Sequence, residues 1–329
     1  MDVENNSLPY LQTFSENNCF LCGKNILEEY SDEHVFPKWL QEIFNLWDQT
    51  ITLLNKSSIQ YRYLKVHCCQ TCNNKYLSKN ETIIHKGVSE GFDRFKNIEE
   101  PIIFQWLGKI FYSILYKELI LLADRSDPTI GTINTKEYLE TFNGLHSLLQ
   151  SSRYPTKFEF HYPWSIYIFK IKPFGDNRDF DFNDDCDRGA VKIRMNDIGV
   201  IACLMDHGTV KKILADRFRN VDQRILHPIQ FDELAAIVFY QNSLLSRNPS
   251  FVNILDDDTN EPKLSVCPLP IGGYSLKPIF THWNMDHYLV IFSKFVHKYG
   301  YSYSDLVRGD YFCSFTFDPD GSFHQLISE

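Results

Sequence analysis

Two Cys-x-x-Cys pairs constrain this chain of 329 residues more than any other feature of its sequence. The first pair is Cys19 and Cys22, followed by Gly23, and the second pair is Cys69 and Cys72. Together they supply four thiolates, the complete tetrahedral ligand set of a structural zinc ion. A glycine directly after the first pair suits a backbone that must turn tightly there. The sequence therefore predicts a zinc-stapled domain in which the zinc has no open position for catalysis.

The other five cysteines do not share this spacing. A total of nine, an odd number, argues against the disulfide framework of a secreted protein. The N-terminus has neither the basic nor the apolar segment of a secretion signal, and charges interrupt the most apolar stretch, 102–123. We expect a cytoplasmic protein that does not enter a membrane. Its remaining cysteines should be small buried side chains or inert thiols: Cys68, Cys186, Cys203, Cys267 and Cys313.

Residues that could carry chemistry lie between and after the two pairs. His34 follows Asp32 and Glu33, and a histidine beside a carboxylate can act as a base while the carboxylate binds a divalent ion. Asn73 and Asn74 follow the second pair, in what we expect to be the first turn of a helix. Their amide oxygens could supply a further ligand for a hard cation such as Mg²⁺.

In order and spacing, these residues resemble the HNH, or ββα-metal, endonuclease superfamily over residues 19–85. The matching residues are Cys19, Cys22, the block Glu33-His34-Val35-Phe36-Pro37, Cys69, Cys72 and Asn73. The resemblance implies a hairpin followed by a helix, holding one catalytic Mg²⁺ or Mn²⁺ ion. It also implies that His34 deprotonates the water that attacks a phosphodiester, and that Glu33 and Asn73 bind the metal.

Two departures from the family pattern leave alternatives open. The family often has Asp directly before the base, whereas Glu33 stands here with Asp32 one residue further back, so either could bind the metal. The middle Asn that usually orients the base is not evident in 61–68. A zinc-organised binding module that has lost catalysis is therefore the rival hypothesis. An RNA-cleaving HNH-like toxin is another, although we expect DNA as the substrate.

The charge distribution favours local contact with nucleic acid. A net charge of −9 argues against a protein that coats nucleic acid by bulk electrostatics. However, 49–80 contains no Asp or Glu and carries five basic residues, of which we expect Lys65, Lys75 and Lys79 to contact phosphates. A solvated basic face is the alternative. Glu81 and His85 lie four residues apart and are most simply a solvated surface pair.

We expect an α+β protein with a polar lead-in over 1–18, the zinc-bound HNH domain over 19–100 and a larger α+β body over 101–329. The body should hold a long helix opened by Pro101, strands in a small antiparallel sheet and a C-terminal hairpin turning at 318–321. Further helices are predicted over 135–149, 210–218, 231–245 and 283–299, and strands over 164–172, 189–195 and 199–205. The acidic stretch 176–187 should be a loop, including Asp181, Asp184, Asp185 and Asp187.

The body offers no comparable motif. HNH domains joined to an unrelated larger partner are common in bacterial restriction and anti-phage systems. By that analogy we expect a defence nuclease whose body recognises DNA, a partner protein or an activating signal.

Overall fold

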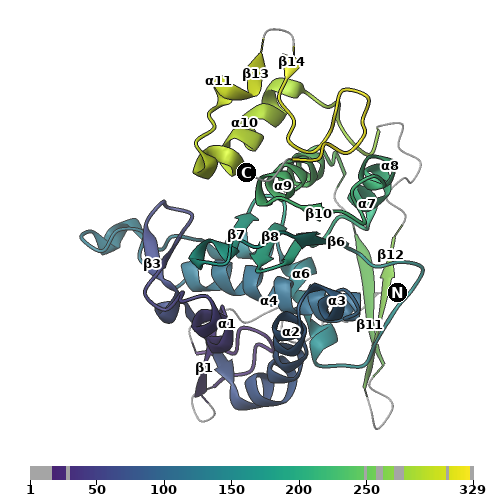
Figure 1. Ribbon diagram of the computed structural model, residues 1–329. Helices are drawn as coiled ribbons and strands as arrows, with labels where there is room; N and C mark the ends of the chain where they lie inside the picture. The colour runs from purple at the N-terminus through teal and green to yellow at the C-terminus, as the bar shows by residue number, and fades with distance from the viewer. Residues whose placement is uncertain are drawn as a thin grey trace. The chain divides into compact units, whose positions relative to one another are not determined.

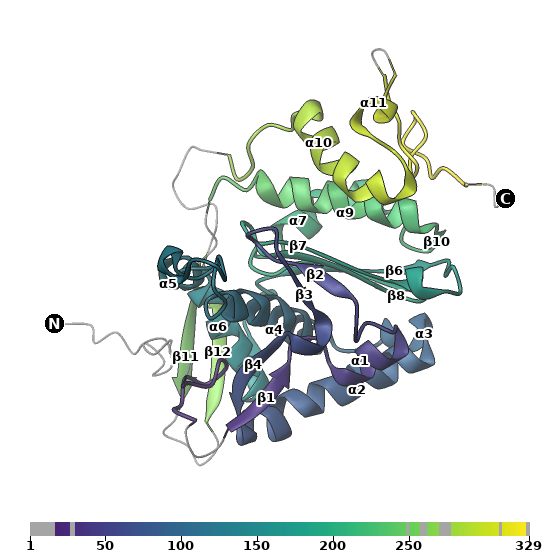
Figure 2. The same cartoon turned by 90° about the vertical axis from the view of Figure 1, so that its left-hand side faces the viewer.

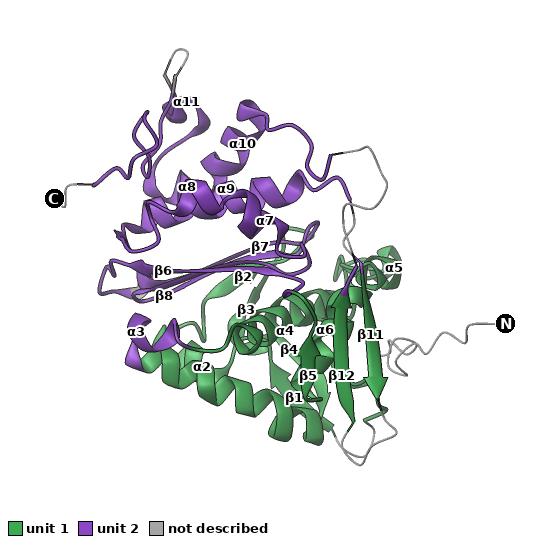
Figure 3. Cartoon of the chain, turned by 90° about the vertical axis from the view of Figure 1, so that its right-hand side faces the viewer, with its two compact units in different colours: residues 1–89, 98–160, 251–267 green, residues 90–97, 161–250, 268–329 purple. Residues whose placement is uncertain are grey.

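The computed structural model describes residues 17–26, 30–247, 250–256, 262–269, 278–308 and 311–326, so most of the expected lead-in lies outside the described residues. The chain is mixed α+β with small sheets, as predicted (Figure 1, Figure 2). It divides into two compact units (Figure 3). Unit 1 comprises Met1–Ser89, Ile98–Phe160 and Phe251–Cys267, and unit 2 comprises Glu90–Asn97, His161–Ser250 and Pro268–Glu329. None of the described helices is long and apolar enough to cross a membrane.

Unit 1 begins with two antiparallel strands. β1 (Tyr30–His34) pairs with β4 (Lys65–Cys69), so that Tyr30 lies opposite Cys69 and His34 opposite Lys65. After β4, a π-helical segment leads directly into a longer helix, which gives the order strand, strand, helix. The intervening and following elements are α1 (Lys38–Ile43), β2 (Thr50–Thr52), β3 (Ser58–Gln60), η2 (Tyr61–Tyr63), η3 (Cys72–Leu77) and α2 (Ser78–Glu90).

The core of unit 1 is built around α4 (Glu100–Glu118), which has Pro101 in its first turn, in agreement with the predicted start of a long helix. It is buried on nearly all sides, as expected of a helix that is apolar around its circumference. Because α4 packs within unit 1, this unit extends well past the expected boundary at residue 100. The other elements of unit 1 are η4 (Pro128–Ile130), α5 (Lys136–Glu140), α6 (Asn143–Leu149), η5 (Gln150–Ser152), β5 (Thr156–Phe158), β11 (Phe251–Asp256) and β12 (Lys263–Pro268).

Two features of these elements differ from the prediction. The single helix expected over 135–149 is split into α5 and α6, although Thr135 caps it as predicted by accepting a hydrogen bond from the Tyr138 amide. The sheet of β11, β12 and β5 was not predicted at all. In it β5 pairs in parallel with β12, which lies about a hundred residues later in the chain.

Unit 2 is centred on a five-stranded sheet in the order β10-β6-β9-β8-β7. The strands predicted over 164–172, 189–195 and 199–205 are confirmed, and Asn196 makes the turn between the last two with a φ of 52°. The prediction of an acidic loop over 176–187 is wrong for 180–185, because these residues form an edge strand of this sheet. The strands are β6 (Ser165–Ile171), β7 (Phe180–Asp185), β8 (Ala190–Met195), β9 (Ile198–Cys203) and β10 (Ile225–Leu226).

Helix α9 (Pro228–Ser243) covers one face of this sheet, and α10 (Met285–Val296) packs against α9 (Figure 2). The contact of α9 with the sheet is close, because a Cβ added at Gly199 of β9 would lie 2.6 Å from the ring of Phe231 on α9. The helices predicted over 231–245 and 283–299 are thus confirmed, with shifted ends. The remaining elements of unit 2 are α3 (Phe92–Phe95), η6 (Asn177–Asp179), α7 (Thr209–Ile213), α8 (Ala215–Phe218), η7 (His297–Tyr299), α11 (Tyr303–Leu306), β13 (Val307–Arg308) and β14 (Tyr311–Phe312).

Within the described residues, the predicted C-terminal hairpin is present only around its turn. The Gly321 amide donates to the Asp318 carbonyl at 2.8 Å, and Phe317 bridges Phe323. The first arm leaves this pairing, because the side chain of Glu233 on α9 accepts hydrogen bonds from the Ser314 hydroxyl and the Phe315 amide.

Candidate functional site

The four cysteines of the two pairs meet in one place. The sulfur atoms of Cys19, Cys22, Cys69 and Cys72 all lie within 4.8 Å of one another. In the first pair, the Gly23 amide donates to the Cys19 carbonyl at 2.8 Å, and Gly23 has a φ of 68°, as its predicted turning role requires. In the second pair, the Cys72 amide lies 3.4 Å from the Cys69 sulfur. This group could hold a metal ion such as zinc.

The close approach of the sulfur atoms affects their protonation. Hydrogen bonding to the Cys19 sulfur raises the pKa of Cys69 and of Cys72 well above the ordinary thiol value. Metal ligation requires the thiolate form, so a bound zinc ion would displace these protons. Cys68 is buried, and its sulfur lies 3.8 Å from that of Cys19, but it is not a member of the four-sulfur group. The prediction that Cys69 is the member of this group, and not Cys68, is confirmed.

His34 ends β1 and is 9% exposed. The Gln41 side chain of α1 orients its ring, with Nε2 lying 3.3 Å from His34 Nδ1 and 2.7 Å from the Phe36 carbonyl oxygen. Because a carbonyl only accepts, the Gln41 amide nitrogen is the atom that faces the ring, so Nδ1 accepts and the ring proton lies on Nε2. Burial, and then Lys65 and Lys38, lower the pKa of His34 to about 4. His34 is therefore neutral at pH 7.

Glu33 faces away from the His34 ring. Successive side chains of a strand point to opposite faces, so Glu33 lies on one face of β1 and Asp32 and His34 on the other. Glu33 is buried, and its carboxylate forms an ion pair with Lys109, which reaches it from α4. The Lys109 ammonium is also 3.1 Å from Glu81 Oε1. Glu33 is thus engaged within the core of unit 1.

The protonation of this cluster follows from its burial. Burial raises the pKa of Glu33 to about 7, although the charge of Lys109 opposes the rise. Burial also disfavours the charged form of Lys109, but Glu33 and Glu81 outweigh it and raise the pKa of Lys109 above its ordinary value. Lys109 therefore keeps its charge, and Glu33 takes up a proton as the pH falls through about 7.

The other predicted ligands of the divalent ion do not gather around the Glu33 carboxylate either. Asp32 is exposed, accepts a hydrogen bond from the Tyr30 hydroxyl and lies 3.8 Å from the Lys65 ammonium. Asn73 donates from Nδ2 to the Ser31 hydroxyl at 2.7 Å, on the same side of β1 as Glu33. Asn74 is exposed. Asp32 is therefore the carboxylate of β1 that shares a face with His34.

The predicted nucleic-acid contacts and the expected surface pair have different outcomes. Lys75 and Lys79 are exposed, as a phosphate contact requires. The prediction that Glu81 and His85 form a solvated surface pair is wrong. Glu81 binds Lys109, and the His85 ring stacks on the Trp39 ring with centroids 4.6 Å apart.

Sequence reasoning missed two residues of the site. Lys109 was visible only as a charge inside a long apolar stretch, a pattern that signals a buried ion pair when a partner exists. Gln41, which is fully buried, carried no signal of its role in orienting His34.

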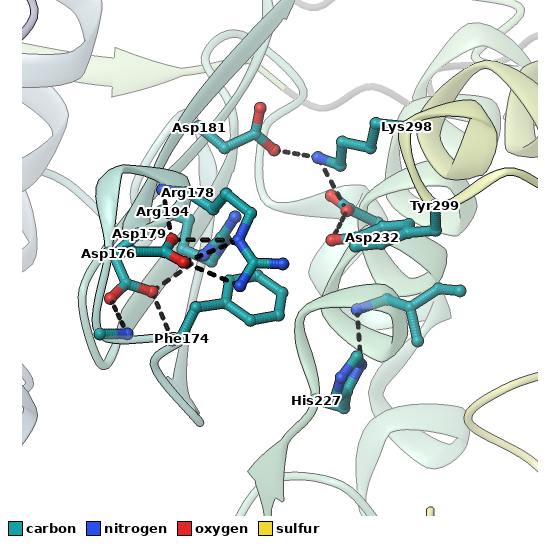
Figure 4. A network of polar contacts seen from close by, with 12 residues as sticks. Phe174, Asp176, Arg178, Asp179, Asp181, Arg194, His227, Asp232, Lys298 and Tyr299 are labelled. Carbon is teal, nitrogen blue, oxygen red and sulfur yellow. Dashed lines mark hydrogen bonds and ion pairs between the residues drawn. The ribbon is translucent and has the colours of Figure 1, made fainter. Parts of the chain in front are cut away.

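Two acidic residues of unit 2, Asp181 and Asp232, are engaged in a network of ion pairs (Figure 4). The Asp181 carboxylate binds both Lys192 and Lys298. Asp232 of α9 lies 2.9 Å from Lys298 and accepts a hydrogen bond from the Tyr299 hydroxyl at 2.7 Å. This network joins β7 and β8 to α9 and η7, which explains why 180–185 is an ordered strand and not a solvated loop.

In the part of the chain that the structure describes, only the four cysteines form a group of three or more His, Cys, Asp or Glu side chains able to hold a metal ion. No model of a known protein family, no curated protein and no solved structure matches the chain.

Proposed function

We propose that the N-terminal part of unit 1 is a zinc-organised, HNH-type nuclease module that hydrolyses phosphodiester bonds, with DNA as the first candidate substrate. The observation that carries the proposal is the neutral imidazole of His34. It stands at the end of β1, which pairs with β4, and the four-cysteine group ties the turn at Cys19–Gly23 to the end of β4 and the start of η3. A neutral imidazole is the form that can take a proton from an attacking water.

The charges around His34 support a polyanionic substrate. Lys65 and Lys38 lie close enough to lower the pKa of His34, and the same positive potential attracts a phosphodiester. In the proposed step, His34 accepts a proton from water on Nδ1 while the water oxygen forms a bond to phosphorus and the phosphorus bond to the leaving oxygen breaks. The Gln41 amide covers Nδ1, so it must release this nitrogen during the step.

The divalent ion implied by the HNH resemblance does not fit at Glu33, because the ammonium of Lys109 already neutralises that carboxylate. The same observation supports a second candidate function, a zinc-organised module that binds nucleic acid without cleaving it.

Cleavage of supercoiled plasmid separates the two functions. Purified wild type, His34→Ala and the control His287→Ala, which removes an exposed histidine of unit 2, are incubated with and without Mg²⁺ or Mn²⁺. We expect the wild type and the control to cut, and His34→Ala to retain its zinc and lose at least a hundredfold in rate. Equal cutting by all three proteins would rule out His34 as the base. Binding of plasmid and RNA without cleavage of either favours the binding module. Cleavage of RNA but not of plasmid would make RNA, and not DNA, the substrate.

A further inference from the structure

Four oxygen atoms face the ammonium of Lys109. They belong to the Glu33 carboxylate, to Glu81 Oε1 at 3.1 Å, to the His34 carbonyl at 2.7 Å and to the Val35 carbonyl at 3.3 Å. We propose that these oxygens form a cation site whose permanent occupant is the Lys109 ammonium, which excludes a divalent ion from Glu33. The inference deepens the proposed function at the same site, but its test measures ion binding and not cleavage.

The donor set is typical of a hard cation. Two carboxylates and two backbone carbonyls, with no nitrogen or sulfur, are the ligands that Mg²⁺, Mn²⁺ and Ca²⁺ prefer in proteins. A lysine ammonium is a compact point charge with three donors, so it can occupy the same position. Both kinds of ion cannot share the site, because a divalent ion would lie against a positive charge inside a poorly solvated core.

The burial of the three charged side chains determines which cation occupies the site. The side chains of Lys109 and Glu33 are 2% and 7% exposed, whereas that of Glu81 is 21% exposed. Lys109 stands in the middle of α4, between Gly108 and Ile110, which are both buried. Leaving the site would bury the ammonium elsewhere without a partner, which is strongly unfavourable. The lysine is therefore a fixed component of the site and does not exchange with solvent ions.

The site also joins the elements that a catalytic metal would join. Glu33 belongs to β1 and Glu81 to α2, and Lys109 holds both from α4. In the ββα arrangement implied by the sequence, a divalent ion would connect the strand and the helix. The covalently attached ammonium provides that connection here, so the chain should carry zinc as its single tightly held metal.

Titration of zinc-loaded full-length protein with Mn²⁺, followed by electron paramagnetic resonance, tests the inference. We expect Glu33→Gln to leave the binding curve of the wild type unchanged, because no Mn²⁺ reaches Glu33. Lys109→Met, which removes the charge and keeps the apolar stem, should gain one Mn²⁺ site at least tenfold tighter than any site of the wild type. The double variant Lys109→Met with Glu81→Gln should lose that gain.

A wild-type Mn²⁺ site that Glu33→Gln abolishes would overturn the proposal, and this comparison stands even if Lys109→Met fails to fold. A folded Lys109→Met variant that gains no site would also overturn it. The nuclease proposal would fail in a different way. His34→Ala would then cleave as fast as the wild type, and the Mn²⁺ binding curves would stay as expected here.

Discussion

Replacing Glu33 by Gln should remove a specific pH dependence from the stability of unit 1. The pKa of Glu33 is raised from 4.5 to about 7, mainly by burial. Glutamine has nearly the same shape as a protonated glutamate but does not ionise. A difference of about 2.5 in pKa corresponds to about 3 kcal/mol in the free energy of unfolding.

The sign follows from proton binding in the two states. Between pH 4.5 and 7 the folded chain retains the Glu33 proton more strongly than the unfolded chain, so its stability falls as the pH rises. The stabilisation is fully present below pH 4.5 and is lost as the pH passes 7. Wild type and Glu33→Gln should therefore be similar in stability near pH 4.5, and the variant should be about 3 kcal/mol more stable near pH 8.

Denaturant unfolding of both proteins from pH 4.5 to 8 measures this difference. The relevant transition is the one that zinc chelation abolishes, which identifies unit 1. Asp206 titrates in the same window, because burial raises its pKa to about 6, but it belongs to unit 2 and not to the Glu33 cluster, so its contribution cancels in the difference. Two stability curves that run parallel over the whole window would refute the reasoning.

Three further predictions concern the metal group, the His34 ring and the sheet of unit 2. Cys72→Ser should lose zinc and the chelator-sensitive unfolding transition, because metal binding supplies much of the folding energy of such a domain, and a folded, fully active variant would contradict it. The His34 ring should titrate near pH 4 in an NMR experiment, and Lys65→Met should raise that midpoint, whereas an unchanged midpoint argues against a positive potential at the site. Gly199→Ala should destabilise unit 2 by about 1–3 kcal/mol in thermal unfolding, because the new Cβ would overlap Phe231, and no change in stability would speak against that packing.

The parts of the molecule that could be predicted from the sequence are those set by local patterns. Spacing alone identified the four cysteines, since each pair is a short turn and only Cys69 stands at the correct distance from Cys72. Local signals likewise identified Pro101 at the start of α4 and Thr135 at the cap of α5. Each of these depends on residues within a few positions of one another.

The parts that could not be predicted depend on partners that are distant in the sequence. The split between α5 and α6 and the pairing of β5 with β12 are decided by tertiary contacts. The edge strand β7 did carry a local signal, because Phe180 and Phe182 alternate with polar residues. Its aspartates masked that signal, and one partner of Asp181, Lys298, lies more than a hundred residues later.

The alternation of side chains between the two faces of β1 has the largest consequence for function. Glu33 and His34 are neighbours in the sequence, but β1 extends through His34, so the two side chains lie on opposite faces of the strand. Chemistry at His34 and cation pairing at Glu33 are therefore separable. Asp32→Asn should alter cleavage, because Asp32 shares the face of His34. Glu33→Gln should leave cleavage unchanged and alter the pH dependence of stability. If Glu33→Gln abolishes cleavage while Asp32→Asn retains it, the strand must bend at His34 in the active protein.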